Sequence, residues 1–132
     1  MVILTMLTPL KKAILTLSLV GLLSSSVVAE GELELINKQR SRHNLYALLE
    51  DPELTTLAHE RLQANIKRGR WDHYRVNGRM IGRFRPARVE GCGKVSSSSR
   101  WYTCFWNTKK YKHAGAARAK VGNKYWQLLL LR

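Results

Sequence analysis

The chain has 132 residues, which suits one domain and leaves little room for two. Its 23 lysines and arginines and its nine aspartates and glutamates give a formal net charge of +14, which excludes an acidic or charge-balanced protein. Such a charge favours polyanions such as nucleic acid, acidic wall polymers, acidic glycans or anionic membrane surfaces, although it also serves simply to keep an exported protein soluble.

The first 29 residues are predicted to be a signal peptide. Lys11 and Lys12 supply a positive region, residues 13–23 form an apolar run, and small or hydroxylated residues lead to a cleavage site after Ala29. The alternative is a retained membrane anchor, but the run is shorter than the about 20 apolar residues that cross a bilayer. We therefore expect a secreted, extracellular or cell-envelope protein with no transmembrane span after cleavage, and export argues against genomic DNA as the main partner.

Residues 30–132 form the predicted domain, in which 21 basic and nine acidic residues give a formal net charge of +12, because the leader contains two lysines and no acid. Residues 32–48 contain no glycine or proline and are expected to form a first helix. Its polar middle places Asn37 and Arg40 one turn apart. We expect structural roles for both, with Arg40 donating hydrogen bonds to nearby carbonyls or to Glu90.

A second helix is predicted from Pro52 to about Gly69. Asp51 is a typical capping residue, proline suits the first helical position, and glycine is common just after the last one. Leucines at positions 54, 57 and 62 recur with a helical period, which indicates one buried face.

The segment that follows this helix, up to Arg88, is dense in arginine, and aromatic residues are interleaved with it. Arginine and aromatic side chains together bind phosphate groups and stack on bases or sugar rings. The alternative is a solvated basic face beside core aromatics. The residues that we single out as candidates for polyanion binding are Arg70, Arg75, Arg79, Arg83 and Arg85.

The last part of the chain is predicted to be rich in strands. Residues 96–99 form an exposed serine loop by composition, and the aromatic residues 100–107 are expected to be a strand or a short helix. A hairpin is predicted over residues 111–131 with Gly122-Asn123 at its turn. The apolar run 128–131 is typical of a strand buried on both faces. Helices followed by a covered sheet indicate an α+β domain with α-β-α layers.

Cys92 and Cys104 are the two cysteines of the chain. In an exported protein an even number of cysteines favours a disulfide, which we predict between these two residues. It would close a loop of about a dozen residues, which is worth roughly 2–3 kcal/mol in the chain-entropy model.

Several short motifs follow one another in a recognisable order. They are Asn37-Lys38-Gln39-Arg40, Asp51-Pro52-Glu53-Leu54, the lone His73, Val89-Glu90-Gly91-Cys92-Gly93 and Tyr111-Lys112-His113-Ala114-Gly115. In this order they resemble the CAP superfamily, also called SCP-like domains, over residues 35–131. The resemblance implies a three-layer α-β-α sandwich with a central antiparallel sheet, here truncated.

Many CAP proteins hold two histidines and two glutamates in a central cleft, and some bind zinc there. The resemblance matches His73 to the first histidine and Glu90 to the first glutamate, so these two residues are the cleft candidates. The second pair should lie within residues 94–112, which contain neither residue type. Two protein ligands bind zinc only weakly, so no cofactor is expected. The alternative is that His73 is a surface residue and that Glu90 pairs with an arginine such as Arg88.

No catalytic residue is predicted from the sequence. Residue spacing indicates no Ser-His-Asp or Cys-His arrangement. The leading hypothesis is a secreted, non-catalytic CAP-like module that binds an apolar or anionic ligand, such as an anionic polymer, a glycan or a lipid surface. One alternative is a metal-assisted hydrolase or protease-like CAP protein that uses His73 and Glu90. The other is a cationic defence or adhesion protein that acts on membranes or walls.

Overall fold

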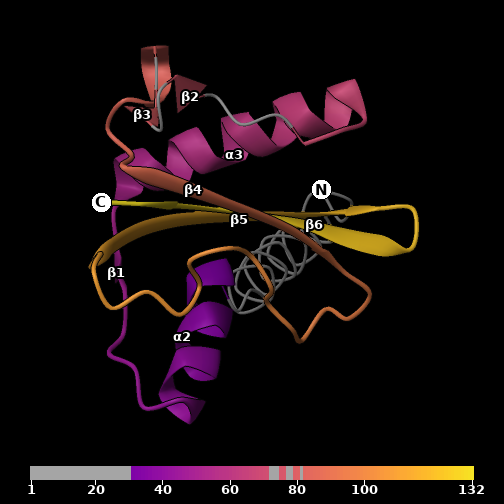
Figure 1. The fold of residues 1–132 in the computed structure, drawn as a ribbon. Coiled ribbons are helices and arrows are strands. Elements are labelled where there is room, and N and C mark those ends of the chain that lie inside the picture. Colours follow the sequence, from indigo (N-terminus) through magenta and orange to yellow (C-terminus); the bar gives the residue numbers. More distant parts are fainter. Residues whose placement is uncertain (1–30, 72–74, 77–78, 81) are drawn as a thin grey trace, which may run out of the picture. The chain divides into compact units, whose positions relative to one another are not determined.

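The computed structural model describes residues 31–71, 75–76, 79–80 and 82–132 (Figure 1). Its elements in chain order are α2 (Glu32–Arg42), β1 (Leu49–Glu50), α3 (Pro52–Arg68), β2 (Arg75–Val76), β3 (Arg79–Met80), the 3-10 helix η1 (Gly82–Phe84), β4 (Val89–Val95), β5 (His113–Val121) and β6 (Lys124–Leu131). The α+β class expected from the sequence is confirmed. Within these ranges, neither α-helix has the length and apolar character that a bilayer crossing needs.

The four-stranded sheet is mixed, not purely antiparallel as expected. Its order is β1-β5-β6-β4, and β2 and β3 pair separately. β5 and β6 form the predicted hairpin, with Val121 opposite Lys124, and β6 continues antiparallel to β4. β1 instead pairs in parallel with β5, because this short strand follows the sheet edge on its way from one helix to the other.

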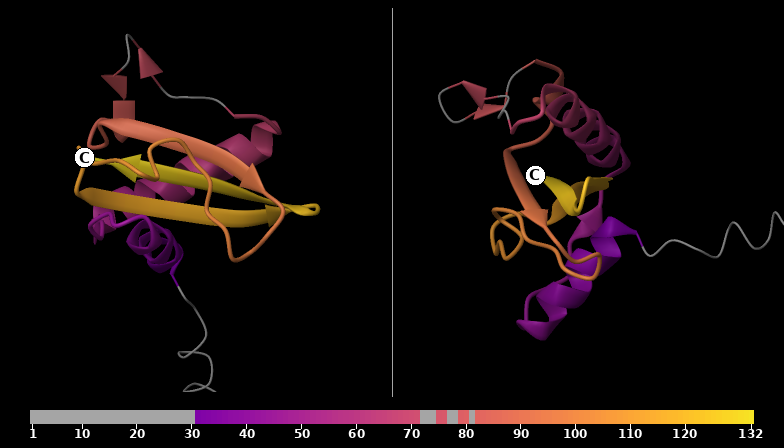
Figure 2. Two further views of the ribbon diagram at one scale, coloured as in Figure 1. Left: turned by 60° about the horizontal axis from the view of Figure 1, so that its bottom comes forward. Right: turned by 90° about the vertical axis from the view of Figure 1, so that its right-hand side faces the viewer.

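The helices α2 and α3 cover opposite faces of the sheet (Figures 1 and 2). The core beneath α3 includes Leu54, Leu57, Leu62, Leu128 and Leu130, and the core on the α2 side includes Ile36, Leu48, Trp101, Leu129 and Leu131. Successive residues of a strand point to alternate faces. The run 128–131 therefore fills both cores, and all four leucines are fully buried, which confirms the prediction of a doubly covered strand.

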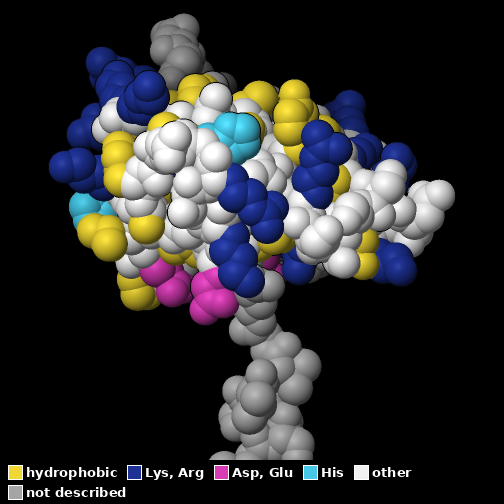
Figure 3. Space-filling view, turned by 90° about the horizontal axis from the view of Figure 1, so that it is seen from below, with side chains coloured by type: hydrophobic (Ala, Val, Ile, Leu, Met, Phe, Trp, Pro, Cys, Tyr) yellow, Lys and Arg dark blue, Asp and Glu magenta, His cyan; other side chains and the backbone are white. Residues whose placement is uncertain are grey.

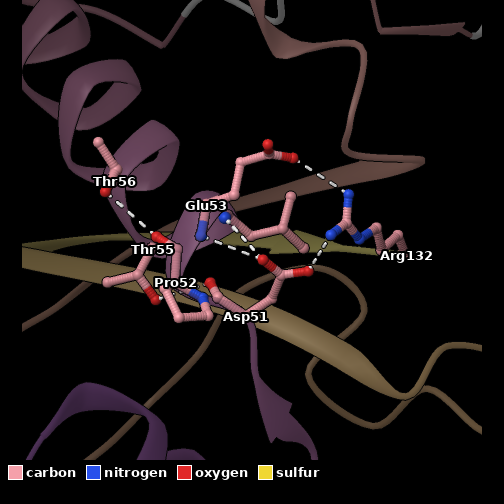
Figure 4. Close-up of polar contacts among 7 residues, drawn as sticks. Asp51, Pro52, Glu53, Thr55, Thr56 and Arg132 are labelled. Atoms are coloured by element: carbon pink, nitrogen blue, oxygen red, sulfur yellow. Dashed lines mark hydrogen bonds and ion pairs between the residues drawn. The ribbon is translucent and has the colours of Figure 1, made fainter.

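Helix α3 begins and ends where the sequence predicts. The Asp51 carboxylate accepts hydrogen bonds from the backbone N–H groups of Glu53 (3.1 Å) and Leu54 (3.3 Å). Arg132 pairs with both Asp51 and Glu53, so the first turn of the helix is tied to the residue that follows the end of β6 (Figure 4). The helix ends at Gly69, whose φ of 72° lies in the left-handed region.

Helix α3 lies so close to β5 that Gly115 leaves no space for a side chain. A Cβ at this position would overlap with the backbone of Leu54 and Thr55. Ala117, two residues further along the strand, faces the same core beneath α3 and is fully buried. Small residues on β5 therefore set the distance between the helix and the sheet.

Helix α2 ends at Arg42, six residues earlier than expected. Asn44 has a φ of 58°, which a continuing helix does not allow, and the N–H of Leu45 donates back to the carbonyl of Arg40 at 3.0 Å. The chain leaves the helix here, and residue 48 then enters the core on the α2 side.

Candidate functional site

The cleft candidate Glu90 is buried in an ion pair with Arg61 of α3. The exposed fractions are 1% for Glu90 and 2% for Arg61. Arg61 Nε donates to Glu90 Oε2 at 2.9 Å and Nη2 donates to Oε1 at 3.1 Å. The guanidinium also lies over the ring of Phe84, 5.3 Å from its centroid. Glu90 therefore pairs with an arginine, as one of the two interpretations of the sequence held, but this arginine is Arg61 and not Arg88, because Glu90 points toward the sheet face that α3 covers.

This ion pair bears on the role of zinc ligand that the CAP resemblance implies for Glu90. Both carboxylate oxygens already accept hydrogen bonds from a cation, so a metal ion beside them would meet the buried positive charge of Arg61. His73, the other cleft candidate, lies outside the described residues. Among the residues that are described, no three or more His, Cys, Asp or Glu side chains form a group able to hold a metal ion. In this arrangement the Glu90 carboxylate does not fit the role of a zinc ligand.

Asn37 and Arg40 connect α2 to the rest of the domain. The Asn37 amide donates to the carbonyl of Leu48 (3.0 Å) and accepts from its N–H (2.8 Å). Arg40 is fully buried and donates to the carbonyls of Tyr46 (2.9 Å) and Trp106 (2.8 Å). Burial lowers the pKa of Arg40 from its ordinary value, although an arginine keeps its charge in proteins.

Two of the five polyanion candidates meet in one hollow, which we call the arginine hollow. Arg79, Arg85 and Arg88 line it together with Met80 and Ala87, and its volume is about 390 Å³. The three arginines are exposed, whereas Met80 and Ala87 are buried. None of the three guanidinium groups pairs with a carboxylate in the described part of the chain.

Of the other three polyanion candidates, Arg83 and Arg70 do not line this hollow. Arg83 pairs with Glu60, with 2.6 Å between Nη2 and Oε1, and is mostly exposed. Arg70 is exposed just beyond the end of α3. The side chain of Arg75 lies outside what the structure describes. Among the candidates whose side chains the structure describes, Arg70 and Arg83 therefore lie apart from the pair in the hollow.

The aromatic segment 100–107 forms turns, so the expected strand or short helix is wrong. Trp101 is fully buried, and its indole N–H donates to the Thr103 hydroxyl at 2.9 Å. Phe105 has a φ of 66°, which neither a right-handed helix nor a strand permits. Between these points Tyr102 is 60% exposed.

A second basic area surrounds Tyr102, and the sequence analysis did not identify it. Tyr102 lines three hollows, of about 340, 520 and 390 Å³. The cations that line the first hollow are Lys94, Arg100 and Lys124. Those that line the second are Arg42 and Arg100. We call Tyr102 and these four cations the Tyr102 surface. The face seen from the α2 side carries Lys and Arg across its width, whereas Asp and Glu gather in one small area (Figure 3).

The predicted disulfide is not formed in this structure, because Cys92 and Cys104 are both free thiols. The half-buried Cys92 donates from Sγ to Glu90 Oε1 at 3.5 Å, while Cys104 is exposed. Burial, together with the Glu90 carboxylate, raises the pKa of Cys92 above its ordinary value. Both residues nevertheless line the same hollow of about 390 Å³.

Comparison of the chain with models of known families, with curated proteins and with solved structures finds no match in any of the three. The resemblance to CAP proteins therefore depends on the order of its short sequence motifs. The structure adds an α+β fold with a four-stranded mixed sheet and two helices.

Proposed function

We propose that this chain is a secreted, non-catalytic module of CAP-like character that binds an anionic ligand. The arginine hollow carries this proposal. A guanidinium group presents a planar fork that can donate two parallel hydrogen bonds to phosphate or carboxylate oxygens. Arg79, Arg85 and Arg88 place three such groups around one hollow with a buried apolar floor. This arrangement suits a group with several negative charges, such as phosphate.

The CAP-like part of the proposal includes a three-layer α-β-α sandwich. The helices α2 and α3 on opposite faces of the sheet support it. The parallel pairing of β1 departs from a purely antiparallel centre. Export is supported by the leader pattern of residues 1–29.

The non-catalytic part is supported by the state of Glu90. A metal-assisted hydrolase would need this carboxylate as a base or ligand, but Arg61 holds both of its oxygens in a buried pair. Separating the two charges in the interior would leave each of them poorly solvated, which is costly. Glu90 therefore serves better as a structural residue than as a reactive one.

Calorimetric titration with inorganic polyphosphate tests the site. We compare the wild type with a variant in which Arg79, Arg85 and Arg88 are replaced by alanine. A control variant loses three exposed charges elsewhere, through Lys67→Ala, Lys109→Ala and Lys112→Ala. We expect the hollow variant to bind at least about tenfold more weakly than the control, because it loses guanidinium forks and not charge alone. Equal weakening of both variants would mean unspecific charge attraction.

Two further measurements separate the alternatives. Vesicles of anionic phosphatidylglycerol and of neutral phosphatidylcholine show whether the phosphate belongs to a lipid surface or to a free polymer. Zinc titration tests the hydrolase alternative: saturable zinc binding that His73→Ala or Glu90→Gln abolishes would overturn the non-catalytic assignment. Binding that persists at high salt would exceed simple charge attraction, since screening weakens exposed ion pairs.

A further inference from the structure

Tyr102 stands where three hollows meet, and its phenol ring is among the most exposed large side chains of the described residues. Its exposed fraction is 60%, and it lines all three hollows. No aspartate or glutamate of the described residues lines any of them. An exposed aromatic ring in an area without acidic side chains is typical of a surface that binds an anionic ligand.

Two of the four cations of the Tyr102 surface, Lys94 and Lys124, are held in place by other side chains. Lys94 lies over the Trp126 ring, with its ammonium 4.1 Å from the ring centroid. Lys124 donates from Nζ to the Ser96 hydroxyl at 2.9 Å. A cation–π contact and a hydrogen bond both restrict long side chains that would otherwise sample many rotamers. The surface thus offers two positioned ammonium groups beside one exposed ring.

The backbone on both sides of Tyr102 is fixed by two side-chain amides. Gln127 of β6 donates to the carbonyl of Arg100 (2.7 Å) and accepts from the N–H of Tyr102 (2.8 Å). Gln39 of α2 donates to the carbonyl of Trp101 (2.8 Å) and accepts from its N–H (3.2 Å). Gln127 is fully buried, so its amide needs these partners. Arg100 and Tyr102 consequently face outward from an anchored segment.

The same segment rests directly on strand β4. A Cβ at Gly91 would overlap with the carbonyl group of Cys104, and a Cβ at Gly93 would overlap with that of Tyr102. Only glycine permits this approach, because any other residue would push the loop away from the strand. The Gly-Cys-Gly sequence of β4 is therefore part of what builds the Tyr102 surface.

We propose that the Tyr102 surface binds an acidic polysaccharide of the uronic-acid type. A sugar ring packs on the phenol face, and its carboxylates pair with Arg100 and the neighbouring lysines. The hydroxyls of Ser96 and Ser97 line the same hollow and suit sugar hydroxyls as hydrogen-bonding partners. This proposal goes beyond the function assigned to the arginine hollow, since it concerns another site and a ligand with rings.

Binding to polygalacturonate tests the proposal, with fully methyl-esterified polygalacturonate as the uncharged match and polyphosphate as an anion without rings. We compare the wild type with Tyr102→Ala, Tyr102→Phe and Arg100→Ala, and Leu49→Ala serves as a control that removes another exposed apolar side chain. We expect Tyr102→Ala to weaken polygalacturonate binding at least about tenfold and polyphosphate binding less than about twofold. Tyr102→Phe and Leu49→Ala should bind like the wild type, and the methyl ester should bind more weakly.

Three outcomes would overturn the proposal. The first is unchanged polygalacturonate binding by Tyr102→Ala, and the second is an equal loss for both polymers. The third is tighter, Tyr102-dependent binding of a single-stranded oligonucleotide, which would make nucleic acid the ligand. A cooperative thermal unfolding transition is the check that each variant is folded. In the variant without Arg79, Arg85 and Arg88, Tyr102→Ala should still weaken polygalacturonate binding, so a failed arginine hollow would not hide this result.

Discussion

Arg61 on α3 and Glu90 on β4 form a two-point ion pair that joins a helix to the sheet in the protein interior. The resemblance to CAP proteins places Glu90 in a ligand cleft, but here its carboxylate is a structural partner. This relationship makes the pair the first target for mutation.

Replacing Glu90 by alanine should destabilise the domain strongly. The Arg61 guanidinium would stay buried beside Phe84 and lose its two-point bond to this carboxylate, and the loss of one partner of a buried pair typically costs about 3–5 kcal/mol. Urea unfolding gives the free energy of unfolding. The control is Arg83→Ala, which breaks the exposed pair with Glu60 and should cost less than about 1 kcal/mol. Similar losses in both variants would contradict a buried structural pair.

Gly115→Ala should disrupt the packing of α3 on the sheet. The added methyl group would overlap with the backbone of Leu54 and Thr55, which no side-chain rotation relieves. Overpacking of this kind costs about 1–3 kcal/mol or more, and thermal unfolding measures it. Gly31→Ala is the matched control, because nothing lies within 4 Å of its Cβ position. An unchanged melting temperature for Gly115→Ala would show that the helix is not so close to β5.

Asn37→Ala should lower the free energy of unfolding by about 1–3 kcal/mol. This change leaves the N–H and C=O groups of Leu48 without the two bonds that the amide makes. Urea denaturation measures the loss. Ser41→Ala, at an exposed position on the same helix, should leave stability within about 0.5 kcal/mol of the wild type. If Asn37→Ala behaves like Ser41→Ala, the amide does not hold this turn.

The two thiols should differ in reactivity. In the reduced protein at pH 8, iodoacetamide should modify the exposed Cys104 well before the half-buried Cys92, because a raised pKa leaves little thiolate at Cys92. Mass spectrometry of peptides measures both rates. The disulfide stays a prediction for the oxidised protein: alkylation of both residues without reduction would rule it out, and protection of both would support it.

Above pH 9, the free energy of unfolding of the wild type should fall faster than that of a variant without Cys92. The pKa of Cys92 is raised in the folded protein, so its contribution is complete below the ordinary thiol pKa of about 8.5 and is lost as the pH rises further. The slope of the unfolding free energy of the wild type should exceed that of Cys92→Ala by up to about 1.4 kcal/mol per pH unit. Parallel curves for wild type and Cys92→Ala would refute the shift.

Local signals allowed the prediction of α3 and of the β5–β6 hairpin. Asp51, Pro52 and Gly69 act within one turn of the helix ends, and Gly122-Asn123 acts within its own turn. The early end of α2 could not be predicted in the same way. It depends on Asn44 in a left-handed conformation and on contacts between residues far apart in sequence.

The candidate sites depended even more on distant contacts. The arginine hollow brings together only part of an arginine-rich segment, because Arg83 turns to Glu60 instead. The Tyr102 surface needs Gln39 from α2 and Gln127 from β6, which are 88 positions apart in the chain and carry no signal by themselves. Composition identified a basic protein with an aromatic segment at residues 100–107, but not which rings would face solvent.

The close packing of the aromatic segment against Gly91 and Gly93 has a consequence for ligand binding. A loop that is already immobilised against a strand loses little conformational entropy when it binds a partner. More of the contact free energy therefore appears as affinity. An added methyl group at either glycine would shift the loop without touching the partner. It should then shorten the lifetime of a complex while leaving its charge-driven encounter rate nearly unchanged.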